Sequence, residues 1–144
     1  MHPVILTQTD TTVGFLSQDA ARLYEIKSRK KSKPFIKVYS NFETLLACGN
    51  RVPSNQKNRI RRSKKTTFIV KDRAFRVAKS LLNSTILQNS TWHFSTSANE
   101  SNKEFDREFC ENKADIIIED KNALRESVSS SLIKMNNVKR KKIR

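Results

Sequence analysis

The chain has 144 residues, of which 36% are hydrophobic and 30% charged, proportions typical of one soluble globular domain. No stretch approaches the ~20 apolar residues of a membrane-spanning helix, and the first residues lack the pattern of a secretory signal. The two cysteines, Cys48 and Cys110, lie in no CxxC or Cys/His pattern, which excludes a disulfide framework and argues against a zinc site. We therefore expect a single domain over residues 1–144, a reduced cytoplasmic location, no membrane association and no metal ligated by the protein.

The chain is strongly basic, with a formal net charge of +15. Its basic C-terminal end, residues 138–144, follows a more acidic stretch between residues 100 and 126. A charge of this size attracts polyanions such as nucleotide phosphates or RNA at long range. A lysine-rich composition bias accounts for part of the charge.

The first predicted element is a buried strand at Val4–Leu6, which ends at the hydroxyl-rich stretch TQTDTTVGF (residues 7–15). Ser17 is expected to cap the following helix. The apolar face of that helix would consist of Leu16, Ala20, Leu23 and Tyr24. The threonines of this stretch are expected to form one wall of a small-molecule site. Gly14 is expected where the backbone turns closely behind that wall.

A basic run at residues 27–33 leads to Pro34 and to a strand at residues 35–40. Ser40 and Glu43 have the spacing of a capping box for a short helix. The polar stretch at residues 49–65 is predicted as a loop with some helix. The remaining predicted elements are strands at residues 66–70 and 74–78, a helix at 80–88, a strand at 92–94, a helix at 102–113, and strands at 114–118 and 129–135. Alternation of strands and helices predicts an α/β domain around a largely buried sheet.

Several kinds of active site are disfavoured by the residues present. The two glycines, Gly14 and Gly49, stand alone, which excludes a P-loop and a dinucleotide-binding fingerprint. A Ser/His/Asp arrangement would need His2 or His93, and His93 lies in a predicted strand where a structural role is more common. The sequence therefore argues against an enzyme with a protein nucleophile.

Two short motifs could bind a nucleotide. If the backbone after the first helix is extended, Lys27 and Arg29 project to the same side and could hold one anion. Ser97 and Asn99 repeat this spacing at the end of a strand. Taken alone, the first pair also fits a solvated basic helix end and the second fits ordinary turn chemistry.

The order of these motifs resembles the YrdC/TsaC family, the threonylcarbamoyl-AMP synthases. TQTDTTVGF resembles the family signature PTDTVYGL, with Gln8 and Val13 in place of Pro and Tyr. IKSR with KPF is similar to the KxR segment, and STSANES resembles the SAN motif. The remaining matches are KTTFIV with the PGPVT strand, AFRVA with vRvP, SSSLIKM with STIVD, and KIR with the terminal lR-G. The resemblance covers Val4 to Arg144 and implies a short, minimal member with a YrdC-like single domain, a twisted mixed β-sheet with helices packed on it.

The resemblance implies an L-threonylcarbamoyladenylate synthase that condenses L-threonine, bicarbonate and ATP, with Mg²⁺ carried on the nucleotide phosphates. The product would serve N6-threonylcarbamoyladenosine formation in tRNA, together with the subunits of a tRNA-modifying complex. Lys27 and Arg29 would be catalytic, and Thr9 and Thr11 would bind threonine and bicarbonate. The residues implied in ATP binding are Lys27, Arg29, Arg76, Ser97, Asn99, Ser130 and Arg144.

Two alternatives remain open at this point. The first is a non-catalytic YrdC-like protein that binds RNA or nucleotide, which the basic runs at residues 27–33, 57–65 and 139–144 favour. The second is a partner subunit that passes a labile adenylate to a tRNA-modifying complex.

Overall fold

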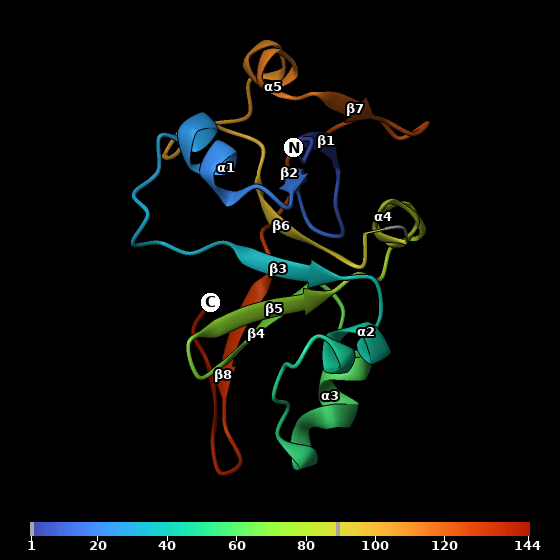
Figure 1. The fold of residues 1–144 in the computed structure, drawn as a ribbon, viewed down its shortest axis with the longest axis vertical. Coiled ribbons are helices and arrows are strands. Elements are labelled where there is room, and N and C mark those ends of the chain that lie inside the picture. Colours follow the sequence, from blue (N-terminus) through green and yellow to red (C-terminus); the bar gives the residue numbers. More distant parts are fainter. Residues whose placement is uncertain (1, 89) are drawn as a thin grey trace.

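The computed structural model describes residues 2–88 and 90–144, and in this part of the chain nine strands form one mixed sheet (Figure 1). The strand order is β7-β1-β2-β6-β3-β5-β4-β8-β9. The strands are β1 (Ile5–Gln8), β2 (Val13–Ser17), β3 (Ile36–Tyr39), β4 (Thr66–Val70), β5 (Arg73–Val77), β6 (Trp92–Ser97), β7 (Ile116–Ile118), β8 (Ser131–Met135) and β9 (Arg140–Lys142). The helices are α1 (Ala20–Lys27), α2 (Phe42–Ala47), η1 (Ser54–Gln56), α3 (Lys57–Arg62), α4 (Leu81–Leu87) and α5 (Arg107–Lys113). The predicted α/β fold with a mixed sheet is confirmed.

Helices pack on both faces of this sheet. On one face, α1 and α5 cover the β1–β2 half through a cluster that includes Phe15, Leu23 and Cys110. The same face carries α2 and α3 over β4 and β5, where Leu45 and Phe75 are buried. On the opposite face, Leu87 of α4 packs against Val38 of β3 and against Ala78, the residue after β5. Both faces can be covered because successive side chains of a strand point to opposite sides.

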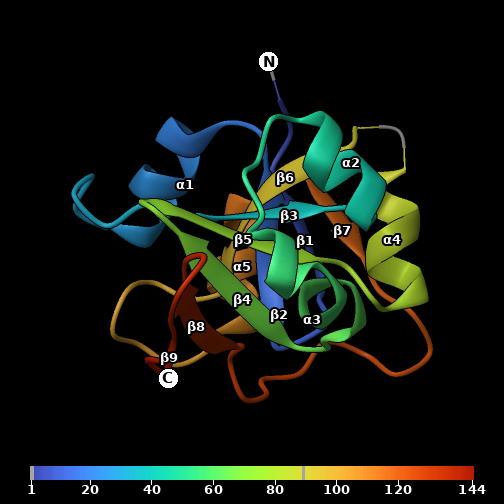
Figure 2. The ribbon, with the colours of Figure 1, turned by 90° about the horizontal axis from the view of Figure 1, so that it is seen from below.

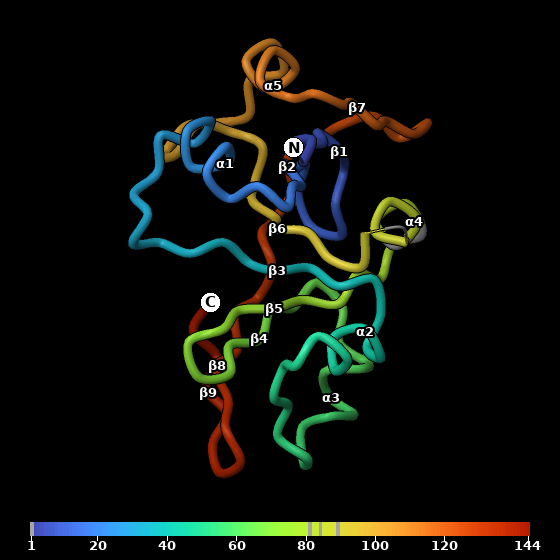
Figure 3. The backbone as a smooth tube through the Cα atoms, viewed as in Figure 1, coloured from blue at the N-terminus to red at the C-terminus, as the bar shows by residue number. Residues whose placement is uncertain are grey.

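Parallel pairings join segments that are distant in the sequence. The strands β1 and β7, β3 and β5, and β4 and β8 pair in parallel, whereas the other neighbours are antiparallel. The pairing of β4 with β8 places the C-terminal hairpin β8–β9 beside the β4–β5 hairpin (Figures 2 and 3). The middle of the chain and its C-terminal end are therefore neighbours in the sheet.

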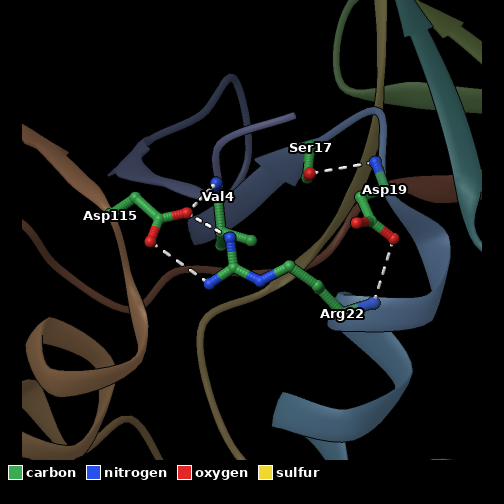
Figure 4. Close-up of polar contacts among 5 residues, drawn as sticks. All are labelled: Val4, Ser17, Asp19, Arg22 and Asp115. Atoms are coloured by element: carbon green, nitrogen blue, oxygen red, sulfur yellow. Dashed lines mark hydrogen bonds and ion pairs between the residues drawn. The ribbon is translucent and has the colours of Figure 1, made fainter. Parts of the chain in front are cut away.

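The start of the first helix differs from the sequence prediction. Ser17 is not the helix cap, because it belongs to β2, and Leu16 lies in that strand as well. The cap is Asp19, whose side chain accepts a hydrogen bond from the Arg22 backbone N–H at 3.2 Å, while Ser17 Oγ accepts from the Asp19 N–H (Figure 4). The strand β2 is buried at every position, so it lacks the alternation that would have revealed it.

An ion pair connects α1 to the beginning of the β7 segment (Figure 4). The Arg22 guanidinium contacts both oxygens of Asp115, and Asp115 Oδ2 also accepts the Val4 N–H at 2.9 Å. The paired guanidinium and this backbone donor lower the pKa of Asp115 below its ordinary value. One partly exposed pair stabilises little by itself, but it joins three elements at the edge of the sheet.

Other boundaries also differ from expectation. The cap of α2 is Asn41 rather than Ser40, α5 begins at Arg107 rather than Asn102, and β6 continues to Ser97. The basic end contains the exposed strand β9, which apolar patterning did not indicate. Within residues 2–88 and 90–144, no helix is both long and apolar enough to cross a bilayer.

Gly14 lies inside β2 and not in a turn, and its neighbours leave no space for a side chain. A Cβ atom at this position would lie 2.8 Å from the Thr96 carbonyl oxygen and 3.0 Å from Thr9 Cγ2. The predicted close approach of the Gly14 backbone to the threonine-rich turn is therefore present, but it occurs within a strand rather than at a turn. The missing side chain allows β2 to pack against both the threonine-rich turn and β6.

We expect Gly14→Ala to destabilise the fold by roughly 1–3 kcal/mol, because the added methyl group meets backbone that cannot rotate away. Gly49→Asn is the matched control. Gly49 has a φ of 81° with no atom within 4 Å of the added Cβ, and asparagine tolerates this left-handed conformation after a helix. Urea denaturation measures both variants. An unchanged midpoint for Gly14→Ala would contradict the proposed crowding.

Candidate functional site

A cavity of about 370 Å³ lies beside the β1–β2 turn, near the starts of β3 and β5 and the end of β6. Its walls combine hydroxyl groups, three arginines and a few apolar side chains, and no acidic residue of the described chain lines it. The hydroxyl-bearing residues are Thr9, Thr11, Thr12, Ser95, Thr96, Ser97, Ser129 and Ser130, and the arginines are Arg29, Arg76 and Arg144. Such a composition suits a polyanionic ligand with oxygen-rich groups.

The hydroxyl-rich stretch forms a tight turn between β1 and β2. Thr9 Oγ1 donates to the Thr12 carbonyl at 2.6 Å and accepts from the Thr11 N–H at 3.3 Å. The hydroxyls of Thr9 and Thr11 also lie 3.3 Å apart. These bonds hold both hydroxyl groups in the cavity wall. Each of these hydroxyl groups can still form a further hydrogen bond, so the bonds within the turn use only part of their capacity.

Asp10 fixes the position of this turn. Its carboxylate accepts the backbone N–H groups of Lys79 at 2.6 Å and Ser80 at 2.9 Å, immediately before α4. Asp10 is 8% exposed, so these two bonds satisfy a buried charge that would otherwise be costly. The turn is thereby attached to a segment about 70 positions away in the sequence.

The other side of the turn is covered by residues 125–127. Gln8 Oε1 accepts the Arg125 N–H at 2.9 Å, and Val13 N–H donates to the Arg125 carbonyl at 3.1 Å. Thr12 Oγ1 accepts the Ser127 N–H at 3.0 Å. Gln8, which departs from the family proline, thus has a structural partner in this chain.

Arg76 brings a buried guanidinium to the cavity from β5. The residue is 4% exposed, and its Nε has no hydrogen-bond partner within the described part of the chain. Burial lowers the pKa of Arg76, and the charge of Arg144 lowers it further, whereas Asp10 acts in the opposite direction. A buried guanidinium with an unused N–H favours an anionic partner in the cavity.

Ser130 and Arg144 form the opposite wall. Ser130 is buried and its hydroxyl lies 2.8 Å from that of Thr67, while Arg144 Nε donates to the Ser130 carbonyl at 3.0 Å. The pairing of β4 with β8 positions these groups. Two predicted residues from the C-terminal end therefore join the same cavity as Thr9.

Arg29 reaches the cavity from the segment that follows α1. One Nη donates to the Pro34 carbonyl at 3.2 Å, and the guanidinium lies 4.9 Å from the centre of the Phe35 ring. Its Nε is buried without a partner in the described chain. These contacts orient the guanidinium and leave part of its donor capacity for a ligand.

Lys27 does not line the cavity. The premise of an extended backbone at residues 27–29 is wrong, because Lys27 ends α1 and Ser28 has a left-handed φ of 50°. Lys27 Nζ donates to the Ser97 carbonyl at 2.8 Å and contacts the side chains of Ser97 and Asn99. Burial, followed by the nearby charge of Arg29, lowers the pKa of Lys27 to about 8.

Asn99 also lies beside the cavity rather than in its wall. Its side chain accepts from Ser97 Oγ at 2.8 Å and donates to the Lys103 carbonyl. Of the predicted site residues, seven line the cavity, whereas Lys27 and Asn99 support it from behind through Ser97. The lining residues that the sequence prediction missed include Thr12, Ser95 and Ser129. The alternation of side chains along β6 could have indicated Ser95, two positions before Ser97.

His93 and the two cysteines, the other residues that could take part in catalysis, have the surroundings of structural residues. His93 is buried, its Nδ1 lies 3.2 Å from Ser90 Oγ, and burial lowers its pKa. Both cysteines are free thiols, and burial raises the pKa of Cys110 to about 11. In the described residues, no group of three or more His, Cys, Asp or Glu side chains is arranged to hold a metal ion.

The fold is shared with several solved structures. Sua5 of P. abyssi, solved in complex with L-threonine, matches with a TM-score of 0.81 and 18% identity over 99% of this chain and 50% of its own. YciO of E. coli matches with a TM-score of 0.76 and 16% identity over 99% and 82%. Full-length HypF, in a phosphate- and nucleotide-bound form, matches with a TM-score of 0.72 and 17% identity over 99% and 26%. This chain thus spans about half the length of the Sua5 chain.

No curated protein matches the sequence. The family model of Sua5, YciO and YrdC, which carries the description "Telomere recombination", matches residues 3–144. The match extends over the sheet, the threonine-rich turn and the walls of the cavity. The chain belongs to the Sua5/YciO/YrdC family.

Proposed function

We propose that this protein is an L-threonylcarbamoyladenylate synthase. The observation that carries the proposal is the cavity itself, where three arginines and eight hydroxyl-bearing residues meet with no carboxylate among them. Nucleotide phosphates need cationic and hydrogen-bonding partners of this kind. Membership of the family supports the proposal, as do the relatives solved with L-threonine and with phosphate and nucleotide.

In the proposed reaction, the nucleophile comes from the substrate. The amine of threonine combines with bicarbonate, with loss of water, to give a carbamate. A carbamate oxygen then attacks the α-phosphorus of ATP, and the bond to the bridging oxygen breaks to release pyrophosphate. This chemistry requires positioning and charge stabilisation rather than a protein nucleophile, which agrees with a described cavity wall that contains no histidine.

Each wall of the cavity has a proposed role. The hydroxyls of Thr9 and Thr11 bind L-threonine and bicarbonate at one end of the cavity, because small oxygen-rich groups can pair with these hydroxyls. Arg29 and Arg76 bind the triphosphate and offset charge that develops on the oxygens around the α-phosphorus. Lys27 acts as a positioning residue, because its ammonium holds the Ser97 backbone at the edge of the cavity. The nucleotide is also bound by Ser97, Ser130 and Arg144, with Asn99 supporting Ser97.

The residues present do not form a protein cage for Mg²⁺. Among the residues that the structure describes, no carboxylate lines the cavity, and the nearby Asp10 carboxylate already accepts two backbone N–H groups. We propose that Mg²⁺ enters bound to the phosphates of ATP, where it would neutralise their charge.

The decisive experiment supplies purified protein with ATP, L-threonine and bicarbonate and measures both pyrophosphate and the threonylcarbamoyl adenylate. We expect both products in equal amounts, and neither when threonine is omitted. Arg29→Ala should lower turnover by about 100-fold or more, because it removes a charged contact to the reacting phosphate. Arg59→Ala, on the exposed surface of α3, is the control. If ATP and threonine raise the melting temperature without turnover, the non-catalytic nucleotide-binding alternative is correct.

Arg76 should affect the free protein and the liganded protein in opposite ways. Removing a buried guanidinium relieves a desolvation cost, so we expect Arg76→Met to melt at the same or a higher temperature than the wild type without ligand. The stabilisation by ATP should fall to less than half, because an anion partner is lost. Differential scanning fluorimetry with and without ATP measures both effects. A lower melting temperature with full ATP stabilisation would assign Arg76 a structural role only.

The titration of Lys27 should be visible in the pH dependence of stability. Its pKa is about 8 in the folded protein, against an ordinary value of 10.5. Between these values the unfolded chain binds the proton that the folded protein has released, so stability rises with pH by up to ~1.4 kcal/mol per unit.

Lys27→Arg stays protonated throughout this window. The difference in unfolding free energy between the wild type and this variant should therefore grow from pH ~8 to ~10, in favour of the wild type. Urea denaturation at several pH values measures it, with Lys57→Arg as an exposed control. A difference that stays constant with pH would exclude the lowered pKa.

A further inference from the structure

The connection between β7 and β8, residues 119–130, contains no helix or strand. It joins the first strand of the sheet to the eighth in spatial order, and Figure 2 shows it as the orange-to-red coil between these strands. Leu124 packs against the hydrophobic cluster of α1 and α5, and Ser130 is buried at the start of β8. Residues 125–129, between these two points, are all exposed, so hydrogen bonds rather than burial hold them in place.

Three hydrogen bonds join this connection to the β1–β2 turn. Gln8 Oε1 accepts the Arg125 N–H at 2.9 Å, and the Arg125 carbonyl accepts the Val13 N–H at 3.1 Å. Thr12 Oγ1 accepts the Ser127 N–H at 3.0 Å. We call these three bonds the latch. Because Gln8 precedes the turn and Val13 follows it, the latch holds the connection across the whole width of the turn.

The latch joins two parts of the cavity wall. Thr12 belongs both to the latch and to the cavity wall, where it lies next to Thr9 and Thr11 in the turn. On the other side of the latch, Ser129 lines the cavity beside Ser130. The latch therefore sets where Ser129 lies relative to the hydroxyls of the turn.

The adjoining part of the wall is fixed without the latch. Ser130 Oγ lies 2.8 Å from Thr67 Oγ1, and Arg144 Nε donates to the Ser130 carbonyl at 3.0 Å. The pairing of β4 with β8 holds this part. Opening the latch would therefore displace the exposed Ser129 while Ser130 and Arg144 keep their places.

Gln8 contributes to the latch through its side chain and does not line the cavity. Its amide oxygen is an acceptor that proline, the residue of the family signature, does not have. The Glu126 carboxylate also accepts the Phe105 N–H. That bond holds the connection on its outer side but does not reach the turn, so the Gln8 bond to Arg125 is the one that a single substitution outside the cavity can remove.

We propose that Gln8 is a positioning residue for L-threonine, which acts by holding the β7–β8 connection closed beside Thr9 and Thr11. The inference rests on the proposed synthase function. With the latch closed, Thr12 and Ser129 complete the threonine end of the cavity. With the latch open, L-threonine loses part of its enclosure. The apparent affinity for a ligand falls with the fraction of molecules in the binding-competent state, so Gln8 controls threonine binding without contacting threonine.

Steady-state kinetics of adenylate formation tests this role. Gln8→Leu keeps the approximate size of the side chain and removes the acceptor. We expect the KM for L-threonine to rise roughly three- to tenfold, which is the effect of one hydrogen bond. The kcat and the KM for ATP should stay within about twofold, because the nucleotide part of the wall is held independently. Gln8→Glu should restore the KM for L-threonine, since its carboxylate can accept the same Arg125 N–H.

The matched control is Asn55→Leu. Asn55 Nδ2 donates to the Asn137 carbonyl at 3.3 Å, and neither residue lines the cavity. This variant also loses one bond between a side chain and the backbone, and all its kinetic constants should equal those of the wild type. An unchanged KM for L-threonine in Gln8→Leu, an equal rise in both KM values, or no restoration by Gln8→Glu would overturn the proposal.

Amide hydrogen exchange followed by NMR tests the latch without turnover. The Arg125 N–H should exchange roughly three- to tenfold faster in Gln8→Leu than in the wild type, and at the wild-type rate in Gln8→Glu. L-Threonine should slow exchange at Arg125 and Ser127 in the wild type. Equal Arg125 rates in Gln8→Leu and the wild type would refute the latch, and rates that do not respond to L-threonine would refute its coupling to the ligand. A wild-type protein that makes no adenylate would refute the proposed function, and the exchange rates would still decide on the latch.

Discussion

The arrangement of the cavity depends on the two hydrogen bonds from the Lys79 and Ser80 backbone to the Asp10 carboxylate. They attach the β1–β2 turn to the start of α4 and thereby fix where the hydroxyls of Thr9 and Thr11 lie. The same carboxylate is near Arg76, where its charge favours the protonated guanidinium. Asp10 thus anchors the turn and reduces the energetic cost of burying the Arg76 guanidinium. Asp10 itself does not line the cavity.

The charged residues of the cavity are separate from those that form ion pairs. Three arginines line the cavity, whereas the ion pairs of the described residues lie elsewhere, on α1, α5 and their neighbours. Unpaired cations repel one another, which lowers the stability of the free protein. Anionic ligands would therefore contribute stability as they bind.

Strands rich in β-branched residues, such as Thr66–Val70, could be predicted from the sequence. The order of the three family motifs predicted the fold. It did not reveal β2, because Val13–Ser17 is buried on both faces and shows no alternation. It did not reveal β9, whose exposed Arg140–Lys142 depends on pairing with β8 rather than on apolar burial. Local patterns carry no information about such partners.

The predicted site residues also divide into those that local sequence could place and those that it could not. Seven of the nine predicted residues line one cavity, because the family motifs lie at strand ends that the sheet brings together. The direction of Lys27 could not be predicted, since it depends on the left-handed Ser28 and on contacts with Ser97 and Asn99, about 70 positions away. The role of Asp10 was hidden for the same reason, because its partners lie at Lys79 and Ser80.

The parallel pairing of β4 with β8 has a consequence for how the protein becomes functional. Thr9 and Arg144 line the same cavity, so the pocket exists only after the two ends of the chain have met. Contacts of such high sequence separation form slowly and late in folding. Local opening of the C-terminal hairpin would dismantle one wall while leaving the β1–β2 half intact. Ligand affinity and the cooperativity of folding are therefore coupled through the last strands of the chain.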